Sequence, residues 1–203
     1  GAGNLLGAQQ SGHMEAVGYD LYCKMLNEAV KSMKGEEVEE EIFETTVDMD
    51  MDAFIPATYI KNEVQKLDIY KRIAEIENEE ELMDMQEELA DRFGDLPNAV
   101  NNLLNIALIK SICHSVYVTS LVQKGNEVTL TMYPKAKLAV EKFPELLVKY
   151  QNSLKLIPQA NPYFIYRMPG NPKGKSDNMN IFTNLEKLLE DFKLLLEEKG
   201  EKE

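Results

Sequence analysis

The sequence has few of the residues on which several classes of protein depend. Its two cysteines, Cys23 and Cys113, lie far apart and do not form a C-x-x-C pair. This usage favours free thiols in a reducing compartment such as the cytoplasm, with a single disulfide as the alternative. No apolar run reaches the roughly 18 residues that a spanning helix needs, so we expect no membrane segment.

Basic residues are also scarce. The 203 residues include 22 Lys and Arg against 35 Asp and Glu, which gives a formal net charge of -13. A chain with this balance is repelled by nucleic-acid phosphates unless one of its faces is locally basic. We therefore expect its partners to be basic protein surfaces, and we do not expect it to bind DNA or RNA on its own.

Residue sets that carry catalysis or bind metals are missing as well. Neither histidine, His13 or His114, has a second ligand at metal-binding spacing. Cys113 and His114 would point about 100° apart on a helix, so they cannot act as a nucleophile–base pair. Residues 170–176 imitate a phosphate-binding loop, but three residues separate the glycines where the motif needs about four, and Pro172 removes an N–H donor. The sequence predicts a non-catalytic fragment without a cofactor or metal of its own, and an enzyme that uses this loop is a less favoured alternative.

A glycine-rich loop opens the chain, without an initiator Met, as expected of a piece cut from a longer protein. Residues 1–12 have the sequence G-A-G-N-L-L-G-A-Q-Q-S-G, and residues 17–26 continue as V-G-Y-D-L-Y-C-K-M-L. Together they resemble the translocation motif shared by the bacterial transcription-repair coupling factors (the Mfd family) and the fork-reversal helicase RecG. Residues 59–73 and 87–97 are similar to the C-terminal domain of the coupling factors alone. The resemblance is dense from Gly1 to about residue 108.

The resemblance implies what the longer protein does. It implies an ATP-dependent DNA translocase, with ATP and Mg²⁺ in its motor, that displaces stalled RNA polymerase and recruits excision repair through UvrA. It also implies that the C-terminal domain is a regulatory domain that docks on the UvrB-like domain of the same protein and masks UvrA recruitment. The family motif E-L-x-D-R-F-G falls on residues 88–94, so Glu88 and Asp91 are expected to contact arginines of that domain. The region around Asp84 is not assigned, and Gln10 is the implied functional residue of the translocation motif.

The helix predicted over residues 79–93 has two contrasting faces. At about 100° per residue its acidic and its apolar side chains gather on opposite sides. The acidic set is Glu80, Glu81, Asp84, Glu87, Glu88 and Asp91, and the apolar set is Leu82, Met85, Leu89 and Phe93. The acidic set is either a solvated helix face or a docking surface. Arg92 is placed to pair with Glu88, four residues earlier.

The remaining pattern predicts an α+β fold, with helices packed on a small, mostly antiparallel sheet. We expect residues 1–35 to be the end of the translocation motif, with a loop followed by a helix over 17–34. Residues 36–44 are expected to be an acidic linker, and residues 45–203 the regulatory α+β domain. Further helices are predicted over 61–77, 79–93, Pro97 to Ile112, 136–151 and 180–198, and strands over 45–51, 116–122, 128–132, 154–157 and 163–167.

Two further expectations follow from apolar positions. In the helix over 61–77, one stripe is expected to contain Val64, Leu67, Tyr70, Ile73 and Ile76. The helix over 17–34 carries Leu21, Met25 and Leu26, through which the fragment would self-associate. The alternative to docking is therefore a plain scaffold or oligomerisation module with no docking role of its own.

Overall fold

The computed structural model describes residues 43–170 and 178–196. These residues form two compact units. The helical unit holds residues 43–44 and 50–111, and the sheet unit holds residues 45–49 and the described residues from 112 onward. The predicted loop and helix over 1–34, most of the acidic linker and the loop over 171–177 lie outside the described residues.

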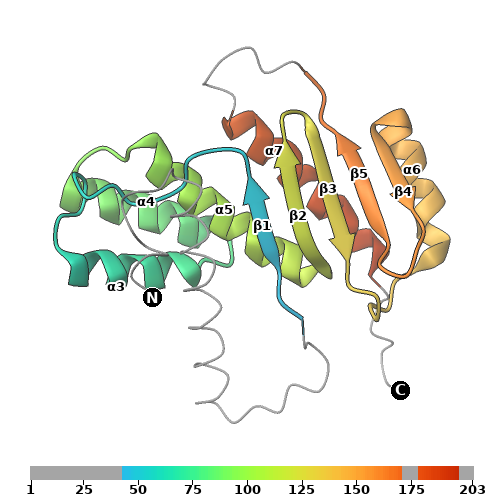
Figure 1. The fold of residues 1–203 in the computed structure, drawn as a ribbon, viewed down its shortest axis with the longest axis horizontal. Helices are drawn as coiled ribbons and strands as arrows, with labels where there is room; N and C mark the ends of the chain where they lie inside the picture. Colours follow the sequence, from blue (N-terminus) through green and yellow to red (C-terminus); the bar gives the residue numbers. More distant parts are fainter. Residues whose placement is uncertain (1–42, 171–177, 197–203) are drawn as a thin grey trace, which may run out of the picture. The chain divides into compact units, whose positions relative to one another are not determined.

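The described residues of the helical unit contain three helices: α3 (Glu63–Ala74), α4 (Glu79–Phe93) and the part of α5 (Asn98–Ser115) up to residue 111. The three helices lie side by side (Figure 1), and the loop over 50–62 precedes them in the sequence. The side chains buried here include Ile69, Ile73, Ile76, Leu82, Met85, Leu89, Val100, Leu103 and Leu104. All three helices start and end within a few residues of the predicted positions.

The stripe predicted for α3 is wrong in its first half. Val64 and Leu67 are 76% and 44% exposed, whereas Ile69 and Ile73 are fully buried. A series that repeats every three residues turns back by about 60° at each step, so it winds around the helix. The step of four from Ile69 to Ile73 stays on one face, and that face is the one that packs, while Ile76 is buried in the loop after the helix.

The sheet unit contains a mixed, mostly antiparallel sheet, which confirms the α+β prediction. The strands lie in the order β1-β2-β3-β5-β4 (Figure 1). Of the described strands, β1 alone runs parallel to its neighbour β2, and the other pairs are antiparallel. The strands span Thr46–Met49 (β1), Val118–Lys124 (β2), Glu127–Met132 (β3), Leu154–Ile157 (β4) and Tyr163–Arg167 (β5).

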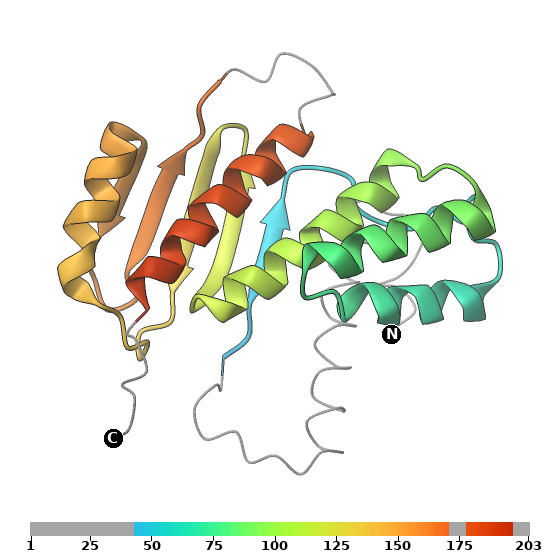
Figure 2. The same cartoon turned by 180° about the vertical axis from the view of Figure 1, so that it is seen from behind.

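Helices α6 (Phe143–Tyr150) and α7 (Asn178–Phe192) lie over the same face of this sheet (Figure 2). The rings of Phe164 on β5 and Phe192 on α7 are 4.9 Å apart between centroids, which places aromatic packing at the centre of this layer. The hydroxyl of Tyr150 donates a hydrogen bond to the carboxylate of Asp191 and so ties α6 to α7. Three 3₁₀ turns, Val140–Lys142, Gln151–Ser153 and Lys193–Leu195, extend these helices.

Two predicted elements of the sheet unit are shorter than expected. Of the helix predicted over 136–151, only residues 143–150 are α-helical, with a 3₁₀ turn before them from residue 140, and Leu138 instead forms an antiparallel bridge with Leu196. The strand predicted over 45–51 ends at Met49, and Met51 is half-buried. None of the helices in the described ranges has the length and apolar character needed to cross a bilayer.

A two-faced helix with an internal ion-pair cluster

Helix α4 begins where the sequence supplies an N-cap. The side-chain oxygen of Asn78 accepts a hydrogen bond from the backbone N–H of Glu81 at 2.9 Å. The carboxylate of Glu81 in turn accepts from the backbone N–H of Glu77 at 2.8 Å. The first bond satisfies one of the N–H groups that a helix start leaves unpaired, and the second fixes the position of the Glu81 carboxylate.

The C-terminal end of α4 is equally well defined. Gly94 has φ of +89° and ψ of -172°, a conformation that is open to glycine and strained for other residues. The hydroxyl of Tyr59, in the preceding loop, donates to the carbonyl oxygen of Gly94 at 2.8 Å and lies 3.1 Å from that of Leu89. The Tyr59 ring meets Phe93 edge to face at 5.8 Å. Phe93 and Gly94 of the D-R-F-G segment therefore have structural roles.

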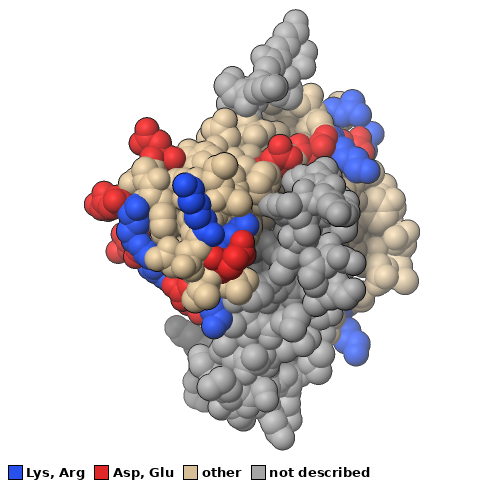
Figure 3. All heavy atoms as spheres, turned by 60° about the vertical axis from the view of Figure 1, so that its left-hand side comes forward, with Lys and Arg blue, Asp and Glu red and all other residues tan. Residues whose placement is uncertain are grey.

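The two predicted faces of α4 are present. Leu82, Met85 and Leu89 are buried, and Phe93 is half-buried. The carboxylates of the opposite side are exposed except for Glu88, which is partly covered; the exposed ones are Glu80, Glu81, Asp84, Glu87 and Asp91. Figure 3 shows acidic and basic side chains close together on the face of the molecule that it presents.

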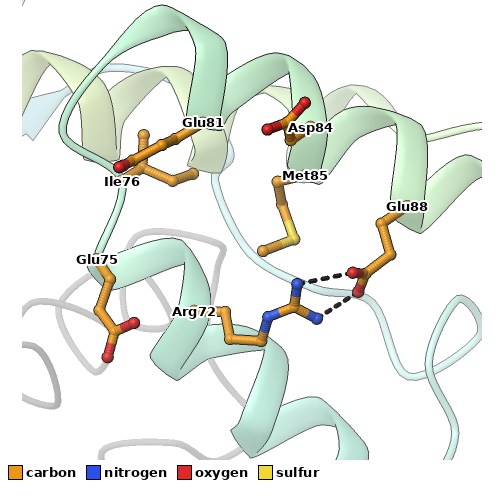
Figure 4. Close-up of a pocket in the computed structure, with 7 residues that line it drawn as sticks. All are labelled: Arg72, Glu75, Ile76, Glu81, Asp84, Met85 and Glu88. Carbon is orange, nitrogen blue, oxygen red and sulfur yellow. Dashed lines mark hydrogen bonds and ion pairs between the residues drawn. The ribbon is translucent and has the colours of Figure 1, made fainter.

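Glu88 is the centre of an ion-pair cluster. The Nη2 atom of Arg72, on α3, donates to Oε1 of Glu88 at 2.7 Å, and its Nη1 atom donates to Oε2 (Figure 4). Arg92 donates to the same Oε2 at 3.1 Å, which confirms the predicted pairing of Arg92 with Glu88. A bidentate contact of this kind fixes the relative orientation of the guanidinium and the carboxylate, in addition to the attraction between their charges.

The ion pair shifts the pKa values of both Glu88 and Arg72. The hydrogen bonds from Arg72 lower the pKa of Glu88 most; desolvation opposes this shift, and Arg92 adds to it. The hydrogen bond to Glu88 likewise raises the pKa of Arg72 above its usual value. Glu88 is therefore a fully ionised group with two basic partners inside the helical unit.

Asp91 has a different environment. It is exposed, and in the described part of the chain it makes no hydrogen bond or ion pair. The same holds for Glu80, Asp84 and Glu87 on this side of α4. The structure thus separates the two residues of the family motif, because Glu88 already has partners and Asp91 has none among the described residues. Gln10, the third predicted site residue, lies outside the described residues.

Arg72 is the member of the cluster that the sequence did not indicate. It lies 16 residues before Glu88 and on another helix. Local spacing rules cover pairs three or four residues apart, so they identify Arg92 and miss Arg72. The sequence gives one indication of this contact, which is that Arg72 directly precedes Ile73, a residue of the buried face of α3.

A partly open pocket of about 280 Å³ adjoins the cluster, between α3 and α4. Figure 4 shows the side chains around it. Its lining is made of Arg72, Glu75, Ile76, Glu81, Asp84, Met85 and Glu88. We call this feature the α3–α4 pocket.

Among the residues that the structure describes, the other reactive groups do not assemble into a site. The thiol of Cys113 is fully buried, and burial raises its pKa, so it is protonated and shielded. Within the described ranges, the His, Cys, Asp and Glu side chains form no group of three or more that could hold a metal ion.

Both the sequence and the fold of this chain are similar to those of known proteins. Residues 49–143 match the TRCF domain family. The crystal structure of a C-terminal domain of transcription-repair coupling factor superposes with a TM-score of 0.60 at 25% identity, over 76% of this chain and 97% of that chain. The chain belongs to the TRCF domain family. The matched region covers α3, α4 with the E-L-x-D-R-F-G segment, α5, and strands β2 and β3.

Full-length relatives give the same assignment. The chain is 42% identical over 141 residues to the transcription-repair-coupling factor of Bacillus subtilis (strain 168). It is 43% identical over 137 residues to the transcription-repair-coupling factor of Staphylococcus haemolyticus (strain JCSC1435). These matches cover 70% and 67% of this chain but only 12% of each relative, so the TRCF domain region is a small C-terminal part of such proteins.

Proposed function

We propose that this chain is a non-catalytic regulatory region of a transcription-repair coupling factor, and that its TRCF domain docks on the UvrB-like domain of the same protein. Docking masks the surface that recruits UvrA. The longer protein is then the ATP-dependent DNA translocase that displaces stalled RNA polymerase and couples it to excision repair. The observation that carries the docking proposal is the exposed acidic side of α4, with Asp91 free of partners among the described residues.

Asp91 and Glu88 take different roles in this proposal. Asp91 offers both carboxylate oxygens to an arginine from outside, which suits a bidentate contact. Glu88 already accepts three hydrogen bonds, from Arg72 and Arg92, of the roughly four that a carboxylate can accept. Asp91 therefore supplies the direct attraction, and Glu88 holds two arginines in place beside it.

The strength of the contact must remain modest. A regulatory contact shifts a conformational equilibrium only when its two states differ by a few kcal/mol, because a much tighter one would never open. An interface built on exposed charges meets this requirement, and added salt weakens it further. The net charge of -13 supports a basic partner surface.

Docking can be measured by titrating the isolated UvrB-like domain of the same protein into this chain at low and high salt. We expect Asp91→Asn to weaken binding by about 10-fold, the equivalent of one charged hydrogen bond of about 1.4 kcal/mol. The matched control is Glu145→Gln, which removes one exposed carboxylate from α6 of the sheet unit. Absence of binding at low salt would refute docking, and equal effects of the two variants would refute the role of α4.

A further inference from the structure

The α3–α4 pocket has an apolar floor and a charged rim. Ile76 of the α3–α4 loop and Met85 of α4 form the floor, and both are buried, at 3% and 6% exposure. The carboxylates of Glu75, Glu81 and Asp84 stand around it, and the Arg72–Glu88 ion pair closes one side (Figure 4). At about 280 Å³ the pocket falls below the 300–1,000 Å³ or so typical of drug-sized ligands, so it suits a single side chain.

The charges of the lining select a cation. Four carboxylates and one guanidinium leave the pocket with a formal charge of -3. The four carboxylates are not arranged to hold a metal ion, since the described residues contain no cluster of three or more suitable ligands. A cation that fits this pocket must therefore be larger than a metal ion, with an apolar part for the floor and its charge at the end.

The pocket already shows how it accommodates a guanidinium. The guanidinium of Arg72 lies against the rim, where Glu88 binds both of its Nη atoms and Met85 lies beside it (Figure 4). The carboxylate of Glu81 is held in place through one oxygen by the N–H of Glu77, and its other oxygen has no partner among the described residues. A second guanidinium would therefore meet a carboxylate whose position is already fixed.

We propose that the α3–α4 pocket receives one arginine side chain from a basic partner protein. The arginine methylenes cover Ile76 and Met85, and its guanidinium binds the carboxylates of Glu81 and Asp84. Arginine suits this site better than lysine because its planar, weakly hydrated head can bind two carboxylates at once. The inference rests on the proposed docking function, to which it adds a second contact point on α4, one that does not involve Asp91.

The pocket can be tested without the partner domain. Methyl-¹³C-methionine NMR of the full chain would follow Met85, assigned with Met85→Leu, during titration with Nα-acetyl-arginine amide. The neutral isostere Nα-acetyl-citrulline amide is the matched control ligand. We expect a saturable shift of the Met85 methyl signal with the arginine ligand and a response at least about 10-fold weaker with citrulline, because only the charged head is attracted to the carboxylates.

Two double variants separate a specific pocket from general attraction. Glu81→Gln with Asp84→Asn removes two carboxylates from the rim, and the new amide at position 81 retains an oxygen that can accept from the N–H of Glu77. Glu79→Gln with Glu80→Gln removes two charges from the same helix outside the lining. We expect the first pair to weaken arginine binding by about 10-fold and the second by less than about twofold. A silent Met85 signal, equal binding of citrulline, or equal effects of the two pairs would overturn the proposal.

The titration with the UvrB-like domain distinguishes this inference from the proposed function. If arginine enters the pocket but the UvrB-like domain does not bind the wild-type chain, the proposed function fails and the pocket stands. If that domain binds in a manner that depends on Asp91, but Glu81→Gln with Asp84→Asn has no effect and Met85 stays silent, the docking function stands and the pocket proposal fails.

Discussion

The ion pair between Arg72 and Glu88 allows a quantitative test of how the helical unit is held together. A double-mutant cycle with Arg72→Gln, Glu88→Gln and both changes together isolates the energy of this pair from the other effects of each substitution. We expect a coupling free energy of about 0.5–1 kcal/mol in the free energy of unfolding.

This magnitude follows from the exposure and geometry of the pair. The side chains of Arg72 and Glu88 are 40% and 34% exposed, so water screens much of their attraction. Exposed pairs contribute about 0.2–1 kcal/mol, and the two parallel hydrogen bonds place this one in the upper half of that range. The i,i+4 pair of Glu88 with Arg92 would add about 0.3–0.5 kcal/mol, which the cycle does not count because Arg92 is unchanged.

The pH dependence has a definite sign. The pKa of Glu88 is lowered in the folded state, mainly by its hydrogen bonds with Arg72. Its contribution to stability is therefore fully present above the unfolded pKa of about 4.3, and it is lost as the pH falls through the lower folded value. The coupling energy should be equal at about pH 7 and pH 5.5 and should decline only below about pH 4.

Urea unfolding followed through the amide NMR signals of α3 and α4 reports on the helical unit alone. Glu145→Gln, on α6, controls for the general loss of a carboxylate in an acidic protein. A coupling energy indistinguishable from zero, or one that declines between about pH 7 and pH 5.5, would contradict the geometry described for this pair.

Two other predictions concern single residues. Gly94→Ala should destabilise the helical unit by about 1–3 kcal/mol in thermal unfolding. The cost is purely conformational, because φ is +89° and no atom lies within 4 Å of the added methyl group. A loss below about 0.5 kcal/mol would show that the loop relaxes freely. Alkylation of Cys113, followed by peptide mass spectrometry, should be at least about 100-fold slower in the folded chain than in urea, since the thiol is fully buried with a raised pKa; equal rates would mean that α5 opens readily.

Helix α4 shows what sequence reasoning can determine. The range 79–93 predicted for it is the observed one, and its two ends are held by Asn78 and Gly94, since caps are local features with strong residue preferences. The division into an apolar and an acidic side also followed from spacing alone, as did the pairing of Arg92 with Glu88. Each of these features depends on residues within one or two helical turns of one another.

The parts that were missed depend on long-range packing. Val64 and Leu67 look like core residues in sequence, and only the packing of Ile69 and Ile73 shows which face of α3 is buried. Arg72 meets Glu88 because two helices lie side by side, and the spacing rule for residues of one helix does not apply to such a pair. The α3–α4 pocket, which needs both helices, could not be predicted from either one.

Strand β1 has a consequence for how this chain can be shortened. The hydroxyl of Thr45, next to β1, donates to the carbonyl of Val118, 73 residues later, and residues 50–111 of the helical unit lie between β1 and β2 in the sequence. During synthesis β1 must wait for residues 118–124 to leave the ribosome, and closing so long a loop adds an entropic cost. Removing residues before position 50 would delete β1. The edge of β2 that pairs with β1 would then be left unpaired and able to bind a strand from another molecule.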